Sequence, residues 1–222
     1  MGDFPSNAET SAIHRCLSGK APVNKPCLSL LCLVAGLSLP AAAAWAHPHV
    51  FITAKVAVDL GADSVARISI EWTFDELFSQ MIIEDYDRAG KGSFTDAEAA
   101  ALRKGAFDNL RNYHYFLAAG IDRKPIPLPP IRDFRPSIRD GRLVYSFSIA
   151  VPIRLPPEGA TLSLIVYDDT YYVAFDKMEA AGITVRTDPA MESSVSIEKA
   201  KIKAEWPGQF MPDMIVIRFR SK

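Results

Sequence analysis

Apolar and polar residues alternate along two neighbouring stretches of the chain, residues 47–60 and 65–74. In the first stretch, Val50 and every second residue after it form an apolar face, while His47, His49 and Phe51 lie on the other face. A period of two is typical of a half-buried strand. Because a Gly-Ala-Asp-Ser turn separates the two stretches, we predict a β-hairpin.

The pattern changes to a helical period over residues 75–112. Asp75 precedes the apolar positions Phe78, Met81 and Ile82, which predicts a helix capped by its carboxylate. A polar loop follows, and Thr95-Asp-Ala-Glu98 then forms a capping box that opens a second helix. We place the end of this helix near residue 112, and we interpret residues 113–117 as the start of a strand rather than more helix.

The remaining chain alternates in short segments that are separated by turn residues. Asp140-Gly141 is a strong two-residue hairpin signal between residues 134–139 and 143–151. Further strands are predicted over residues 162–167, 172–175, 183–186, 195–202 and 214–219. The expected fold class is α+β, mostly antiparallel β and sandwich-like, with a helical hairpin inserted at about residues 75–112.

Residues 1–46 have the features of a cleavable secretory signal. Two lysines precede an apolar run at residues 28–39, and Ala44 and Ala46 fit the small-x-small cleavage rule. The run is shorter than the ~20 residues that span a bilayer, so an uncleaved membrane anchor is the weaker interpretation. Cleavage after Ala46 leaves a single periplasmic β-rich domain, residues 47–222, that begins with His47.

Net charge and cysteine positions limit which partners and metal ligands this protein can have. Removal of residues 1–46, with three basic and two acidic residues, changes the formal charge from −1 to −2, so nothing suggests nucleic-acid binding. All three cysteines lie in the removed segment. The remaining domain therefore has no disulfide and no thiolate for a metal.

The sequence His47-Pro48-His49 is the strongest candidate for chemistry. Residues two apart on a strand project from the same face, so both imidazoles can converge on one ion. Imidazole suits zinc, copper, nickel and iron. We expect Asp75 or Asp168, or water, to complete the site. The competing interpretations are that the histidines lie solvated on a frayed strand, that Asp75 only caps a helix and that Asp168 only shapes a turn.

Residues 87–98 keep the outline of a calcium-binding EF-hand loop. Asp87 stands at position one, Gly92 at position six and Glu98 at position twelve. Positions three and five hold Ala89 and Lys91, which supply no oxygen ligand from their side chains. We therefore expect no calcium binding and interpret the loop as a turn between two helices.

At these residues the chain resembles a bacterial family known as domain of unknown function one-thousand-seven. The resemblance is carried by His47 to Ile52, by Trp72-Thr-Phe-Asp-Glu-Leu-Phe78, by residues 87–98 and by residues 167–175. Asp169 stands where the family usually has proline. The resemblance implies a secreted component of a transport system that works with a nickel/cobalt/zinc-type membrane permease.

We therefore expect a periplasmic binding protein, not an enzyme, that binds a divalent transition metal and passes it to an inner-membrane metal permease. Zn²⁺ is the expected ion, with Ni²⁺, Co²⁺ and Cu²⁺ as alternatives. Two other functions stay open. One is a copper histidine-brace redox enzyme, in which His47 would be joined by His49 or His114. The other is a metal-free periplasmic partner of a membrane complex.

Overall fold

The computed structural model describes residues 49–151, 153–154, 156, 158–200 and 211–222. These residues belong to one compact unit, Ala46–Lys222. The signal prediction for residues 1–46 and the candidate ligand His47 lie outside the described residues. None of the helices formed by the described residues is long and apolar enough to cross a membrane.

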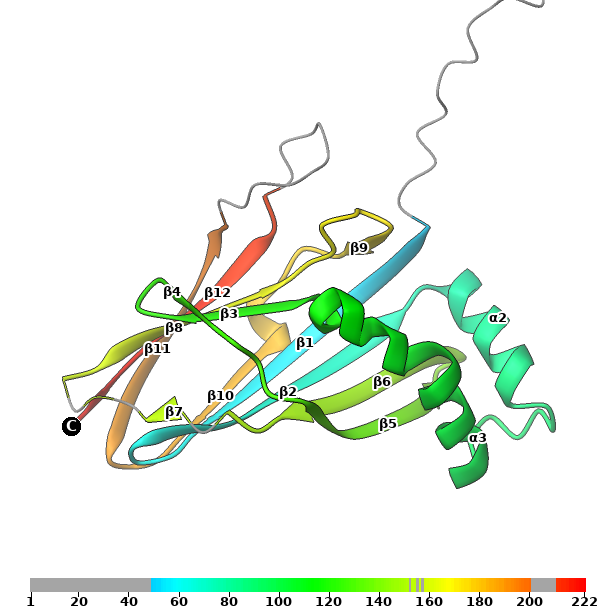
Figure 1. The fold of residues 1–222 in the computed structure, drawn as a ribbon, viewed down its shortest axis with the longest axis horizontal. Helices are drawn as coiled ribbons and strands as arrows, with labels where there is room; N and C mark the ends of the chain where they lie inside the picture. Colours follow the sequence, from blue (N-terminus) through cyan, green and yellow to red (C-terminus); the bar gives the residue numbers. More distant parts are fainter. Residues whose placement is uncertain (1–48, 152, 155, 157, 201–210) are drawn as a thin grey trace, which may run out of the picture. The chain divides into compact units, whose positions relative to one another are not determined.

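Most of the described chain is β-structure, arranged in two sheets (Figure 1). The first sheet has the strand order β10-β1-β2-β6-β5, with β9 also paired to β1 and β7 to β2. Its strands are β1 (Val50–Leu60), β2 (Ser64–Phe74), β5 (Ile131–Arg139), β6 (Arg142–Ile149), β7 (Ile153–Arg154), β9 (Val173–Phe175) and β10 (Ile183–Thr187).

The second sheet has the order β11-β12-β8-β3-β4, and all of its pairs are antiparallel. Its strands are β3 (Leu117–Ile121), β4 (Lys124–Ile126), β8 (Ala160–Val166), β11 (Met191–Lys199) and β12 (Asp213–Ser221). Among the described strands, only β9 and β10 run parallel to their neighbour β1. The prediction of a mostly antiparallel β protein is therefore confirmed.

Both predicted hairpins form as expected. Strand β1 pairs antiparallel with β2, with Ile52 opposite Phe74, across the turn closed by the Gly61 N–H to Ser64 carbonyl bond of 2.8 Å. Asp140 and Gly141 both have positive φ, 52° and 73°, which is the type I′ geometry that the Asp-Gly pair favours.

The helical segments lie between β2 and β3 in the chain. They are α2 (Glu76–Tyr86), α3 (Asp96–Leu102), a π-helical turn (Arg103–Phe107) and a 3₁₀ segment (Asp108–Phe116); a short 3₁₀ turn, Ala180–Gly182, lies before β10. The capping box of Thr95 and Glu98 is present as predicted. The second helix is thus helical over the expected range but changes type along its length.

The prediction of a strand over residues 113–117 is wrong except for its last residue. His114, Tyr115 and Phe116 have positive φ, 52°, 51° and 52°, and β3 begins only at Leu117. A left-handed conformation costs about 1–2 kcal/mol per non-glycine residue. Packing offsets that cost, because the Phe116 ring lies 5.9 Å from Trp72 and the Tyr115 ring 5.2 Å from Phe107.

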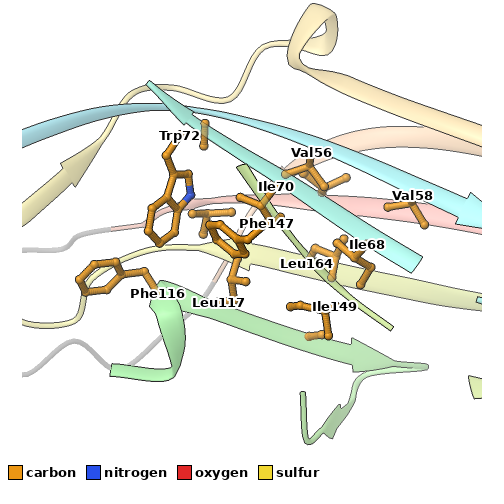
Figure 2. Packing of buried hydrophobic residues seen from close by; sticks show 14 of the residues in the cluster. Val56, Val58, Ile68, Ile70, Trp72, Phe116, Leu117, Phe147, Ile149 and Leu164 are labelled. Atoms are coloured by element: carbon orange, nitrogen blue, oxygen red, sulfur yellow. The ribbon is translucent and has the colours of Figure 1, made fainter. Parts of the chain in front are cut away.

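Side chains of both sheets meet in one hydrophobic core. Figure 2 shows Val56 and Ile70 of the first sheet near Leu117 and Leu164 of the second. Trp72 lies at one end of this core, fully buried, with its ring 4.8 Å from Phe147 in an edge-on contact. The strict alternation of buried and exposed residues along β1 puts Val50 and Ile52 into the core and leaves Phe51 outside.

Candidate functional site

His49 lies immediately before β1 and is held from one side by Tyr172. The His49 N–H donates to the Tyr172 carbonyl at 2.9 Å, and the two rings lie 4.9 Å apart at a tilt of 46°. Strand β9 then continues this contact in parallel, with Val50 opposite Val173. The predicted strand over residues 47–60 is therefore confirmed from Val50 onward, and the imidazole has a defined position at its start.

Asp75 connects the start of β1 to the start of α2. One of its carboxylate oxygens accepts the N–H of Phe78 at 2.9 Å, as an N-cap does, and the other accepts the N–H of Phe51 at 2.8 Å. Its own N–H donates to the Phe51 carbonyl at 2.9 Å. The predicted capping role is confirmed. Because an ionised carboxylate offers about four lone-pair positions, these two bonds leave capacity for a further partner.

Asp168 is the most buried acidic residue near this strand end, with 3% of its surface exposed. One oxygen accepts the N–H of Thr170 at 3.0 Å and its hydroxyl at 2.8 Å, and the other accepts the N–H of Val173 at 2.9 Å. Its carboxylate thus shapes the turn that leads into β9. This geometry favours the turn-forming interpretation of Asp168 over the ligand interpretation.

The pKa of the tyrosine before Asp168 lies above its ordinary value. Burial raises the pKa of the Tyr167 phenol, and the nearby charge of Asp169 raises it further. The Tyr167 N–H donates to the Phe116 carbonyl at 2.9 Å, which links this segment to the left-handed turn before β3. Tyr167 therefore offers a hydroxyl, not a phenolate, to any ligand.

Three of the four residues expected to hold a metal, His49, Asp75 and Asp168, belong to the described part of the chain. Asp75 and Asp168 flank β1 on opposite sides, since one bonds Phe51 and the other bonds Val173, the partner of Val50. Among the described residues, no group of three histidine, cysteine, aspartate or glutamate side chains is arranged to hold a metal ion. Because His47 lies outside the described residues, the metal-site prediction stays a prediction.

The EF-hand-like loop uses its acids to bind its own backbone. The Asp87 carboxylate is buried and accepts the N–H groups of Lys91 at 3.0 Å and Gly92 at 2.7 Å. Glu98 accepts the N–H and hydroxyl of Thr95, both at 2.8 Å, and the backbone bond to Thr95 is the main cause of its lowered pKa. Both acids thus have structural roles that need no cation.

We therefore expect calorimetry to detect no calcium binding to this loop at micromolar concentrations. Ca²⁺ requires six to eight oxygens, and Ala89 and Lys91 provide no side-chain oxygen at positions three and five. Glu98→Gln serves as the matched variant. A micromolar calcium signal that this substitution abolishes would contradict the prediction.

A set of exposed apolar side chains from the start of β1, from α2 and from the turn before β9 was not singled out from the sequence. We call it the apolar patch, and it consists of Phe51, Leu77, Met81 and Tyr172, whose side chains are 48%, 78%, 51% and 50% exposed. The alternation of β1 already placed Phe51 opposite the core. The position of Leu77 on the outer side of α2 needed the helix orientation, which the local pattern does not give.

The protein is thus β-rich, with two sheets and with His49 held in a defined position at the start of its first strand, β1. The chain belongs to the family described as protein of unknown function (DUF1007), whose sequence profile matches residues 31–207. The resemblance noted in the sequence is thereby confirmed.

Two relatives match over shorter stretches. An uncharacterized 15.5 kDa protein in the trpE 3' region of Spirochaeta aurantia is 29% identical over 131 residues, covering 59% of this chain and 93% of the relative. An uncharacterized protein of Haemophilus influenzae is 30% identical over 131 residues, covering 58% of this chain and 62% of the relative.

Proposed function

We propose that the protein is exported to the periplasm, where it binds Zn²⁺ and passes it to an inner-membrane permease without catalysing a reaction. Ni²⁺, Co²⁺ and Cu²⁺ are alternative ions. The observation that carries the proposal is the defined position of His49, whose ring contacts Tyr172 at the start of β1. The Asp75 carboxylate binds the N–H of Phe51, two residues further along the chain. His47 precedes His49 by two residues.

The chemistry of these groups suits a transition metal. Neutral imidazole and carboxylate are the common protein ligands of zinc when cysteine is absent. Cleavage after Ala46 would give His47 a free amine beside its ring, adding a nitrogen ligand. Asp75 keeps unused lone pairs, whereas the bonds of Asp168 to Thr170 and Val173 organise the turn before β9, so Asp75 is the stronger carboxylate candidate.

The apolar patch supports the partner in this proposal. Several large apolar side chains exposed on one part of a fold are typical of a surface that binds another protein. Phe51 is connected to the first turn of α2 through Asp75, and Tyr172 contacts the candidate ligand His49. A permease that binds here would receive the ion where it is held.

The proposal also includes two details of the architecture, a sandwich arrangement of the sheets and a helical hairpin. We infer that the two sheets form a sandwich and that α2 and α3 form an inserted helical hairpin. The shared core supports the first inference, and the position of both helices between β2 and β3 supports the second.

A metal-free partner of a membrane complex is the second candidate. It is favoured by one observation: the carboxylates of Asp75, Asp87 and Asp168 all accept backbone N–H groups, as structural acids do. The copper-brace enzyme has less support, because His114 lines a cavity together with Arg103 and Arg111, and two cations disfavour a metal ion there.

Zinc titration of the mature protein tests the proposal. Competition with a chromophoric chelator should show that His49→Ala weakens binding and that His47→Ala/His49→Ala weakens it at least about tenfold, equivalent to ~1.4 kcal/mol. Binding should also weaken as the pH falls, because protons compete for the imidazole nitrogens. A residue added before His47 should weaken it by removing the free amine.

His114→Ala is the matched control and should bind zinc as the wild type does. Equal zinc, nickel and copper affinities for the wild type and the double variant, at the same pH, would refute the metal site. The metal-free partner would then be the better function.

A further inference from the structure

A cavity of about 880 Å³ opens between the β3–β4 hairpin and the β5–β6 pair. Its floor is aliphatic and comes from both sheets, with Leu117 of β3, Ile131 of β5 and Ile149 of β6 all buried. Leu128, in the proline-rich segment that joins β4 to β5, forms a further part of the floor. This volume and apolar surface are typical of sites for small organic ligands, which occupy about 300–1,000 Å³.

The mouth of the cavity carries positive charge. Arg103, Arg111 and His114 line it, and no acidic residue is among its described lining residues. The side chain of Arg103 is paired with Asp108 at 3.3 Å, whereas no ion pair involves Arg111 among the described residues. Arg111 is therefore the cation at this mouth that has the most to gain from an anionic partner.

The left-handed turn before β3 places His114 at this mouth. Its three residues with positive φ are held by the burial of Phe116 and the ring contact of Tyr115 with Phe107. Strained backbone of this kind persists where packing over-determines it and is concentrated at ligand-binding sites. The strain is thus a second observation, independent of the cavity, that points to the same place.

The floor of the cavity leads toward a smaller hollow inside the core. This hollow has a volume of about 10 Å³ and shares Leu117, Leu128 and Ile149 with the larger cavity. Its other walls are aliphatic and include Val56 and Leu164. An extended apolar group that enters past the cations would therefore point toward this hollow in the core.

We propose that this cavity binds an amphiphilic organic anion, an alkyl carboxylate of medium chain length, with its head group at Arg111 and His114 and its tail against Leu117, Leu128 and Ile149. A cationic amphiphile would be repelled at the mouth, and an inorganic anion would leave the aliphatic floor uncovered. This site is separate from the proposed metal site and does not depend on it.

Calorimetric titration with dodecanoate, below its micelle concentration, tests the proposal on the mature protein. Dodecanoate should bind at least about tenfold more tightly than dodecyltrimethylammonium, which has the same tail and the opposite charge, and than butyrate, which has the same head and a short tail. Equal affinities for the two long-chain ligands, or no saturable binding of dodecanoate, would overturn the proposal.

Two variants locate the site. Leu128→Trp should fill the floor and weaken dodecanoate binding at least about tenfold, and Arg111→Glu should weaken it about three- to tenfold because the contact is at the exposed mouth. Arg88→Glu, an exposed arginine in the loop after α2, is the matched control and should leave binding unchanged. Equal losses in Arg88→Glu and Arg111→Glu would overturn the assignment of the head group.

Circular dichroism of Leu128→Trp checks that the variant folds, and the comparison of the three ligands on the wild type does not depend on any variant. Lysophosphatidylglycerol, an anionic lipid with one acyl chain, separates two sources of the ligand. Binding of dodecanoate alone identifies a free acid, and binding of both identifies a membrane-derived acyl chain.

Discussion

Replacement of Trp72 by alanine is expected to lower the free energy of unfolding by about 3–5 kcal/mol. The indole is fully buried and contacts aromatic rings from three other segments, with centroids 4.8 Å from Phe147, 5.9 Å from Phe116 and 5.8 Å from Phe175. Alanine removes all three contacts and leaves a cavity between the sheets. Urea unfolding followed by circular dichroism measures the loss as a lower midpoint at unchanged slope.

Leu77→Ala is the matched control for this substitution. Leu77 is 78% exposed, so its truncation should change the free energy of unfolding by less than about 0.5 kcal/mol. A free energy of unfolding for Trp72→Ala within about 1 kcal/mol of the wild-type value would contradict the prediction. The aromatic contacts of Trp72 would then contribute little to the stability of the shared core.

Asp168→Ala is expected to destabilise the protein by about 2–4 kcal/mol. The substitution removes the acceptor of the Thr170 and Val173 N–H groups, and the buried Val173 N–H then loses its partner. An unsatisfied buried donor costs about 1–3 kcal/mol, and bonds to a charged acceptor are at the strong end of the range. Amide hydrogen exchange should also become faster at Val173 and along β9.

The neighbouring Asp169 provides the control, because it is exposed and Asp169→Ala should have little effect on stability. Equal urea midpoints for Asp168→Ala and Asp169→Ala would mean that the turn does not depend on the carboxylate. A variant that stays folded but loses zinc affinity would instead restore Asp168 as a ligand candidate.

Local signals in the sequence predicted those elements whose determinants lie within a few residues. Asp75 caps α2, Thr95 and Glu98 form the capping box, and Asp140-Gly141 makes the type I′ turn. In each case the side chain or the backbone freedom of one or two residues is sufficient to fix the geometry.

Features that depend on distant packing could not be predicted in this way. The aromatic run around Tyr115 favours a strand locally, but contacts with Phe107 and Trp72 hold it in a left-handed turn. The parallel pairing of β9 and β10 with β1 also leaves no local pattern, because it depends on which edges remain open once β2 has paired.

At the candidate site, the sequence predicted the residue types better than their roles. It named Asp75 and His49 as candidate ligands of one site, and the observed hairpin register brings residue 75 beside residue 51, near the start of the first strand. It offered both a ligand and a turn-forming role for Asp168, and the structure shows a buried carboxylate bonded to three groups of its own turn. The burial and role of Asp168 depend on where its turn packs in the folded protein.

The position of β1 in its sheet has a consequence for how fast the chain folds. Strand β1 finds β2 at once through the hairpin, but its other edge is completed only by β9 and β10, which lie in the last part of the sequence. Pairing of segments so far apart along the chain has a large entropy cost, because a long loop must be closed. Folding times are then on the order of milliseconds to seconds. Until then one edge of β1 remains open, and an open edge can pair with strands of other chains. Folding of this protein therefore cannot be completed before its C-terminal third pairs with β1. Until that pairing, the partly folded chain is most prone to aggregation.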